Sequence, residues 1–331
     1  MKQLTVCGLL VFGILGMLLS TAHGAGTEKI VLKLGHITAP GGSIDKEAQK
    51  FKELVSAKSE GKVRIDVYPA AQLGKIRELL EGVSMGTVDL ALEAHTFLAQ
   101  LDKDFNFFNA PFLWRSNSEV LDNYYYKGLL EKLRKTNGIR TLSSNGFRSD
   151  MHLFTKTRPV KSLKDLEGLK LRTPSSRAWL DTWNGLGAIA TPIPWSEVYM
   201  ALSQNVIDGM PHNATQVRDE KFYEHLKYCT LLNWKPSLNC IWMSEKKYKR
   251  FSNEIRCILK DSAVEAGAYF TKSEQEEEKK AWAMLKKAGM EVFEVDKEPW
   301  LEKAKAIVKK MDEDGSWSKG LLDEVDRGCR K

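Results

Sequence analysis

The feature that most constrains the fold of this chain is a proline-free segment from Ser252 to Lys287. Its composition favours one helix, either continuous or interrupted near Gly267, with Gly289 as a stop signal. At about 1.5 Å per residue, roughly 36 residues span about 54 Å, which exceeds the width of one lobe. We therefore predict a helix that crosses two lobes. The alternative is a coiled-coil dimer helix, but the heptad repeats of this segment are poor.

The strand and helix pattern also predicts two lobes. The chain has 331 residues, which suits two lobes of roughly 150 residues each. Alternating strand and helix signals predict an α/β fold with mainly parallel sheets, and Ser43 is the expected N-cap of the first helix. The predicted strands are 30–36, 63–69 and 87–94, then 139–155, 169–174 and 206–210; the predicted helices are 44–57, 75–86, 176–187 and 196–205.

The first 24 residues have the pattern of a secretory signal peptide. Lys2 precedes an apolar run, and Ala22 to Gly24 supply small residues at the cleavage positions. We expect cleavage and export; an uncleaved membrane anchor is the alternative. No other apolar stretch reaches the roughly 18 to 20 residues that span a bilayer.

Four cysteines follow the predicted signal, and an exported protein can oxidise them. Four cysteines allow three pairings, and the sequence does not choose among them. Cys229 and Cys240 are candidates for facing strands around Lys235-Pro236, and buried free thiols are an equal alternative. The four are Cys229, Cys240, Cys257 and Cys329.

Charge and motifs exclude several function classes. The formal net charge is +7, but acidic and basic residues alternate, as in "KSEQEEEKKAWAMLKK", which argues against a nucleic-acid partner. No Walker loop, HExxH, G-x-S-x-G or EF-hand pattern is present, so we expect no cofactor, no metal and no enzymatic activity. "GLGAIA" follows a predicted helix, the wrong context for a phosphate-binding loop, and is interpreted as a helix-ending turn.

Cationic and aromatic residues gather at predicted strand ends, where ligands meet open α/β sheets. Arg172 lies at the mouth of the "LKLR" strand, just before "TP". A guanidinium at such a position suits a carboxylate, because its planar fork makes two parallel hydrogen bonds. The complete set of candidate ligand-binding residues is Arg172, Arg148, Trp195, His212, Asn213, His36 and His95.

An ordered set of motifs resembles the solute-binding proteins of tripartite ATP-independent periplasmic (TRAP) transporters. These motifs are "VYPAAQLG", "PFLW", "RPVKSLKDLEGLKLRTP" and "GLGAIATPIPWSEVYMALSQNVIDG". The resemblance implies a two-lobed periplasmic binding protein, type II-like, with a ligand cleft between the lobes and a long connecting helix. The expected division is 25–145 with 238–278 as one lobe, and 146–237 with 279–331 as the other.

The resemblance also implies a function. A protein of this kind captures a small organic acid in the periplasm and delivers it to TRAP membrane subunits, which an ion gradient drives. In this family an arginine matching Arg172 grips the carboxylate, one matching Arg148 assists, and an aromatic residue matching Trp195 packs on the ligand. The family usually has an asparagine where "IDGMPHN" places His212, with Asn213 beside it.

Several alternatives stay open. A periplasmic sensory subunit would use the same pocket, and an adjacent permease gene pair would favour transport. The ligand is an aliphatic carboxylate, an aromatic or keto acid, or a sulfonate. We expect a monomer, although the sequence does not fix the oligomeric state.

Overall fold

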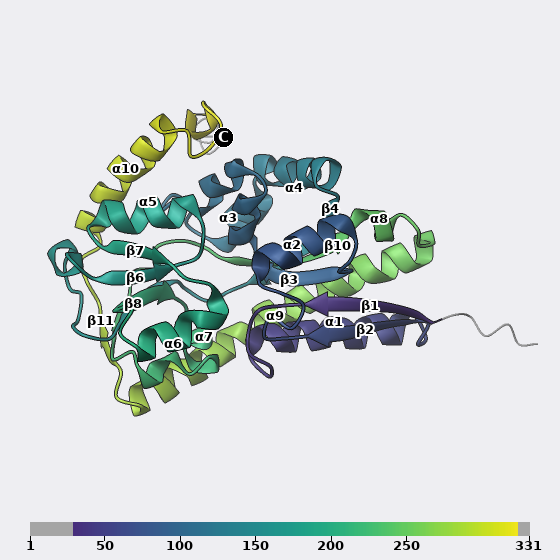
Figure 1. The fold of residues 1–331 in the computed structure, drawn as a ribbon, viewed down its shortest axis with the longest axis horizontal. Helices are drawn as coiled ribbons and strands as arrows, with labels where there is room; N and C mark the ends of the chain where they lie inside the picture. The colour runs from purple at the N-terminus through teal and green to yellow at the C-terminus, as the bar shows by residue number, and fades with distance from the viewer. Residues whose placement is uncertain (1–28, 324–331) are drawn as a thin grey trace, which may run out of the picture.

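The computed structural model describes residues 29–323, so the expected signal segment lies outside the described residues. Within that range the chain forms two α/β lobes side by side, each built on its own sheet (Figure 1). The two-lobed α/β fold expected from the sequence is confirmed. No helix in the described range is long and apolar enough to cross a membrane.

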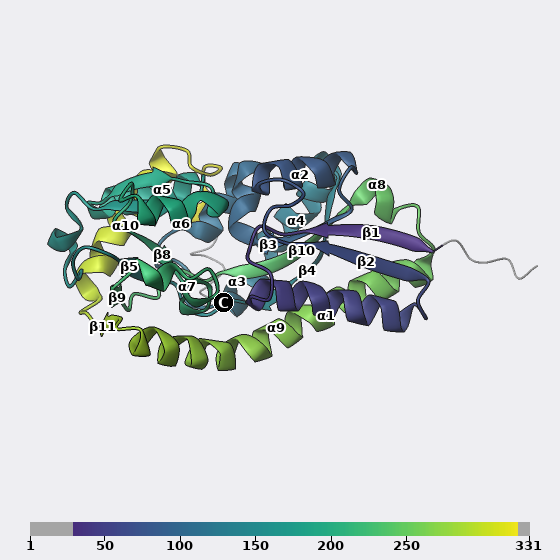
Figure 2. The same ribbon diagram turned by 60° about the horizontal axis from the view of Figure 1, so that its bottom comes forward.

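Lobe I is built on a five-stranded sheet of order β2-β1-β3-β10-β4. Its first three strands are parallel, whereas β10 runs antiparallel to both neighbours, so the sheet is mixed rather than mainly parallel. Helices α1 and α9 cover one face and α2 and α4 the other (Figure 2). The bounds are β1 Ile30–Gly35, β2 Val63–Tyr68, β3 Leu90–Ala94, β4 Ile139–Phe147, β10 Leu238–Ser244, α1 Ser43–Lys58, α2 Ile76–Met85, α3 Asn117–Asp122, α4 Tyr124–Thr136 and α8 Glu245–Tyr248.

Lobe II is built on a six-stranded sheet of order β11-β9-β5-β8-β6-β7. Strand β6 is parallel to β7 and β8, and β5 is antiparallel to β8 and β9. Helices α5 and α10 pack against each other on one side of this sheet (Figure 1). The bounds are β5 His152–Thr155, β6 Lys170–Thr173, β7 Ile189–Pro192, β8 Gly209–His212, β9 Tyr228–Thr230, β11 Glu291–Phe293, α5 Arg177–Leu186, α6 Val198–Ser203, α7 Ala214–Asp219 and α10 Glu298–Glu313.

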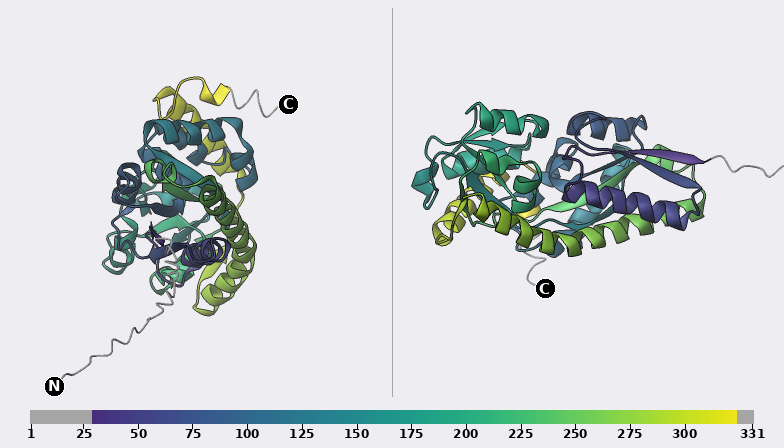
Figure 3. Two further views of the ribbon diagram at one scale, coloured as in Figure 1. Left: turned by 90° about the vertical axis from the view of Figure 1, so that its right-hand side faces the viewer. Right: turned by 90° about the horizontal axis from the view of Figure 1, so that it is seen from below.

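The helix predicted to cross both lobes is α9, Asn253–Lys287, with 35 residues. It contacts α1 and β4 in lobe I and α7 in lobe II, and it runs along the length of the molecule (Figures 2 and 3). The helix continues through Gly267 without interruption. A Cβ at Gly267 would collide with the side chain of Asn145, so the glycine permits close approach of α9 to β4.

One local expectation is wrong, and one open alternative, free thiols rather than facing strands for Cys229 and Cys240, is confirmed. Ser43 is the first residue of α1 rather than its cap; Gly42 is the N-cap, and the Ser43 N–H donates to Asp219 Oδ2 of lobe II at 2.7 Å. Cys229 and Cys240 do not face each other, because β9 and β10 belong to different sheets. Both are buried free thiols and Cys257 is an exposed one, while Cys329 lies outside the described residues.

The interpretation of "GLGAIA" as a helix-ending turn is confirmed. Gly187 follows α5 with φ of 110°, a left-handed conformation that favours glycine. The extended β7 comes directly after it, so no helix N-terminus is available there for a phosphate.

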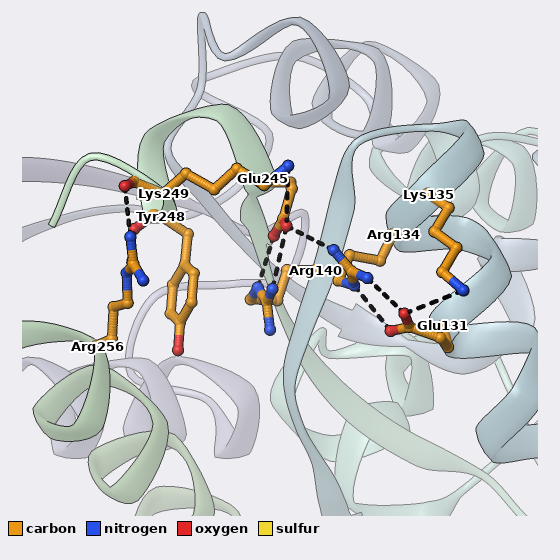
Figure 4. Close-up of polar contacts among 8 residues, drawn as sticks. All are labelled: Glu131, Arg134, Lys135, Arg140, Glu245, Tyr248, Lys249 and Arg256. Atoms are coloured by element: carbon orange, nitrogen blue, oxygen red, sulfur yellow. Dashed lines mark hydrogen bonds and ion pairs between the residues drawn. The ribbon is translucent and has the colours of Figure 1, made fainter. Parts of the chain in front are cut away.

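An ionic cluster joins α4, α8 and β4 within lobe I (Figure 4). Glu245 accepts hydrogen bonds from Arg134 Nη1 at 2.7 Å and from Arg140 Nε at 2.6 Å. The Arg140 guanidinium also lies 4.2 Å from the centre of the Tyr248 ring. These arginines already have carboxylate partners, so the cluster stabilises the lobe rather than offering a site for an anion.

The exact division of the chain between the lobes stays a prediction. Strand β10, inside the segment 238–278, pairs in the lobe I sheet, as that division requires.

Candidate functional site

Arg172 lies in β6, the strand identified from "LKLRTP". Pro174 follows the strand and has no N–H to extend the ladder. The Arg172 side chain is turned inward and only 3% of the residue is exposed. Its Nε donates to the Ile193 carbonyl at 2.9 Å, and the guanidinium lies 5.2 Å from the centre of the Trp195 ring.

Arg172 is a buried cation without an acidic partner. Among residues 29–323, no carboxylate forms an ion pair with it. Burial lowers the pKa of Arg172 from its usual range to about 9. The protein therefore holds a destabilised positive charge that an anion would stabilise.

Trp195 begins a short 3₁₀ turn directly after Pro194. Its indole packs on His212 with ring centres 4.7 Å apart and on Phe222 at 5.2 Å. The indole Nε1 donates to Glu220 Oε1 at 3.0 Å. These contacts fix the plane of the ring beside Arg172.

Arg148 follows the last residue of β4 and is also buried, but it differs from Arg172 in having partners. Its guanidinium donates to Gln216 Oε1 at 3.1 Å and lies 3.4 Å from Glu93 Oε2. It also donates to Asn239, whose amide in turn donates to Glu47 at 2.6 Å. Burial raises the pKa of Glu47 to about 8. Arg148 is thus held in a network before any ligand arrives.

His212 ends β8, and Asn213 caps the next helix. The Asn213 side chain accepts from the Gln216 N–H at 3.2 Å, as an N-cap residue should. Asn213 is fully buried, so its side chain positions α7 rather than lining the cavity. Burial, with the charges of Arg148 and Arg172, holds the pKa of His212 well below its usual range. His212 is therefore a neutral imidazole at physiological pH.

The structure does not bring His36 and His95 to the cavity wall. Both are fully buried. His36 contacts Thr38 through Nδ1 at 3.0 Å and Asp45 through Nε2 at 3.2 Å, which ties the end of β1 to α1. Burial, followed by the charge of Lys235, holds the pKa of His95 well below its usual range. Neither histidine therefore lines the two cavities beside Arg172.

Four of the seven predicted residues meet at one cavity between the lobes. This cavity has a volume of about 30 Å³, and its wall combines residues from both lobes. A larger chamber of about 530 Å³ adjoins it, and Arg172 and Trp195 belong to both walls. The predicted residues that line the small cavity are Arg148, Arg172, Trp195 and His212.

The acidic and amide residues of this site were not among the residues predicted from the sequence. Glu93 lies in β3, where all five residues are buried, so a charged residue in a buried strand was the available signal. Gln216 and Glu220 lie just after the "IDGMPHN" motif and carried no pattern of their own. Glu93 and Gln216 line the small cavity, and both contact Arg148.

Glu220 connects the site to the opposite lobe. Its Oε1 accepts from Trp195 and also from the backbone N–H of Ala39 in lobe I, at 2.8 Å. Burial raises the pKa of Glu220. At the outer edge of the larger chamber, Lys75 of lobe I pairs with Glu197 of lobe II at 2.6 Å. These contacts join the two lobes across the site.

Within residues 29–323, no three histidine, cysteine, aspartate or glutamate side chains are grouped to hold a metal ion. The chemistry that the site offers is charge, hydrogen bonding and apolar contact around Arg172.

Comparison with known proteins places this geometry among periplasmic binding proteins. Residues 34–314 match the model of the bacterial extracellular solute-binding proteins, family 7. The chain is 31% identical over 268 residues to the 2,3-diketo-L-gulonate-binding periplasmic protein of Escherichia coli, covering 79% of this chain and 80% of the relative. It is 30% identical over 294 residues to the C4-dicarboxylate-binding periplasmic protein of Rhodobacter capsulatus, covering 87% and 86%.

A solved structure shows the same architecture. A TRAP periplasmic solute-binding protein from Ochrobacterium anthropi with bound L-fuconate superposes with a TM-score of 0.83 at 27% sequence identity. The match covers 90% of this chain and 98% of that one.

Proposed function

Because the chain belongs to family 7 of the bacterial extracellular solute-binding proteins, we propose that it captures a small organic acid in the periplasm through Arg172 and delivers it to the membrane subunits of a TRAP transporter. The relatives named above are described as binding acids, which supports an acid as the ligand of this chain. Binding here is not followed by catalysis, and the protein acts as a monomer.

The observation that carries this proposal is the unpaired charge of Arg172. Its burial costs free energy that the fold itself does not recover, since no described carboxylate pairs with it. A ligand carboxylate would supply the missing partner in a bidentate geometry. Arg148, by contrast, is already partnered and serves to shape the wall of the cavity.

The two lobes supply the rest of the binding free energy. Charge-assisted hydrogen bonds contribute about 1.5–3 kcal/mol each, so a bidentate pair contributes about 3–6 kcal/mol. Micromolar affinity needs about 8 kcal/mol. Burial against Trp195 and closure of the lobes over the ligand account for the difference, with Lys75–Glu197 and Glu220–Ala39 forming as the lobes close.

We propose the lobe boundaries expected from the sequence, 25–145 with 238–278 and 146–237 with 279–331. The pairing of β10 in lobe I and the path of α9 along both lobes support this division.

The test is to identify the acid and then remove the guanidinium. Mass spectrometry of the denatured, purified protein identifies the acid that co-purifies. Titration calorimetry with that acid should show that Arg172→Ala loses at least about 3 kcal/mol, the scale of a charged hydrogen-bond pair. Arg177→Ala, an exposed arginine on α5, is the matched control and should bind normally. Unchanged affinity of Arg172→Ala would remove Arg172 from the site.

A further inference from the structure

The larger chamber beside Arg172 has a mostly apolar wall contributed by both lobes. Its volume of about 530 Å³ lies within the range of small-molecule sites. Ile37, Ile76, Leu80, Phe97 and Leu101 face it from lobe I, and Trp195 faces it from lobe II. Leu80 and Trp195 are buried, so these side chains form a fixed surface rather than a solvated rim.

The polar groups of the chamber lie mainly toward its exposed side. Glu81, Ser175 and Ser196 are exposed, and Gln100 is half-buried. The inner polar residues belong to the small cavity and not to the chamber: Glu93 and Gln216 are engaged with Arg148 there. The others on that wall are Thr38, Thr96, His212 and Ser237. A polyhydroxylated body would therefore bury several hydroxyl groups against carbon, which costs free energy for each unpaired group.

The cationic side chains around the two cavities are mostly neutralised by acidic partners. Four arginine or lysine residues line them, and three of these have acidic partners within the described range. Lys75 pairs with Glu197 at 2.6 Å, and Arg77 with Glu81 at 3.0 Å. Arg148 pairs with Glu93 at 3.4 Å. Only Arg172 is left to balance a charge on the ligand, so a second anionic group would find no free cation.

Resting on the proposed function, we infer that the ligand of this chain is a monocarboxylate with an apolar body, held by Arg172 at its acidic end and by the chamber wall along the rest of its length. A branched-chain or aromatic 2-oxo acid has this chemistry. The inferred class differs from the sugar acid and the C4-dicarboxylates for which the two relatives are named.

The first experiment compares the affinities of the ligand-free protein for acids that differ in the group attached to the carboxylate. The ligand-free protein is prepared by unfolding and refolding. The probes are 4-methyl-2-oxopentanoate and phenylpyruvate as apolar monocarboxylates, 2-oxoglutarate as a dianion, and galactonate as a polyhydroxy acid. Calorimetry should show that at least one apolar monocarboxylate binds roughly tenfold or more tightly than either 2-oxoglutarate or galactonate. Tighter binding of 2-oxoglutarate or galactonate would overturn the inference.

The second experiment changes the chamber wall. Ile76→Asn should weaken the best apolar acid by roughly fivefold or more, because the half-buried Ile76 side chain faces the chamber. Met85→Asn, at the exposed end of the same helix, is the control and should leave affinity unchanged. Equal affinity of wild type and Ile76→Asn would contradict a ligand body in the chamber.

These outcomes separate the inference from the function on which it rests. If galactonate or 2-oxoglutarate binds best and Arg172→Ala abolishes that binding, the function stands and the ligand class is wrong. If neither the probes nor any co-purified acid bind in an Arg172-dependent way, both are wrong.

Discussion

Replacing each of the two buried arginines by methionine should shift the stability of the ligand-free protein in opposite directions. The lowering of the Arg172 pKa from its usual range to about 9 corresponds to about 5 kcal/mol. Because the folded-state pKa is lowered, the charged form of Arg172 is the destabilised one. This cost is fully present below pH 9 and declines as the pH rises above it.

Arg172→Met removes this cost but also two favourable contacts. The hydrogen bond to Ile193 is worth about 1 kcal/mol and the contact with Trp195 about 0.5–2 kcal/mol. The net gain is then about 2–3.5 kcal/mol. With an unfolding entropy of about 2.1 cal/mol/K per residue, a chain of this length should unfold about 3–5 °C higher.

Arg148→Met should do the reverse. It leaves Glu93, which is 1% exposed, without its cation. Removing one partner of a buried pair costs roughly 3–5 kcal/mol, so the unfolding temperature should fall by about 5–8 °C.

Calorimetric scans and urea titrations of protein stripped of ligand by refolding measure both effects. The stabilised Arg172→Met should also fail to bind the acid that wild type binds. A lower unfolding temperature for Arg172→Met, or equal shifts for both variants, would refute the argument that Arg172 is the uncompensated charge.

Three further predictions follow from the contacts of the site. Glu220→Ala should release ligand roughly 5–10-fold faster in stopped-flow displacement, because Ala39 and Trp195 lose their shared hydrogen-bond acceptor. The control Glu224→Ala should release ligand at the wild-type rate, and an unchanged rate for Glu220→Ala would argue that Glu220 does not hold the lobes closed on the ligand. The pH dependence of affinity between pH 6 and 8 should have the same shape in wild type and in His212→Asn, since His212 stays neutral there; a weakening of wild type through pH 6–7 that His212→Asn lacks would mean a cationic His212. Burial lowers the pKa of His152 to about 4, so the unfolded state binds more protons and the free energy of unfolding falls as the pH drops below about 6.5. Between pH 7 and 5, urea titrations should show that His152→Asn loses about 2 kcal/mol less of its free energy of unfolding than wild type does. An equal loss in the two proteins would contradict this.

Local patterns in the sequence predicted the parts of the fold that depend on local physics. The alternation of strand and helix signals gave β1 to β3 with α1 and α2, and the proline-free run gave α9. Arg172 was identified because a strand, a proline and a charge are adjacent in sequence. The predicted division placed 238–278 in lobe I, but no local pattern indicated that β10 inserts antiparallel between β3 and β4, because both neighbours lie far from it in the chain.

The contacts that complete the site join distant segments, and no local pattern reports them. Ala39 and Glu220 are 181 positions apart, and Ser43 and Asp219 are 176 apart. The same distance explains the error at Ser43: a carboxylate from the other lobe accepts from the first N–H of α1, so a local cap was not needed. His36 was predicted to contact the ligand because it follows a strand, but Thr38 and Asp45 contact its two ring nitrogens.

The most direct test of the central claim is a crystal structure of the protein with its co-purified acid bound. We predict two oxygens of one carboxylate within about 2.7–3.1 Å of the Arg172 guanidinium nitrogens, with the acid enclosed between the lobes. An acid bound elsewhere, with Arg172 making no contact to it, would contradict the account.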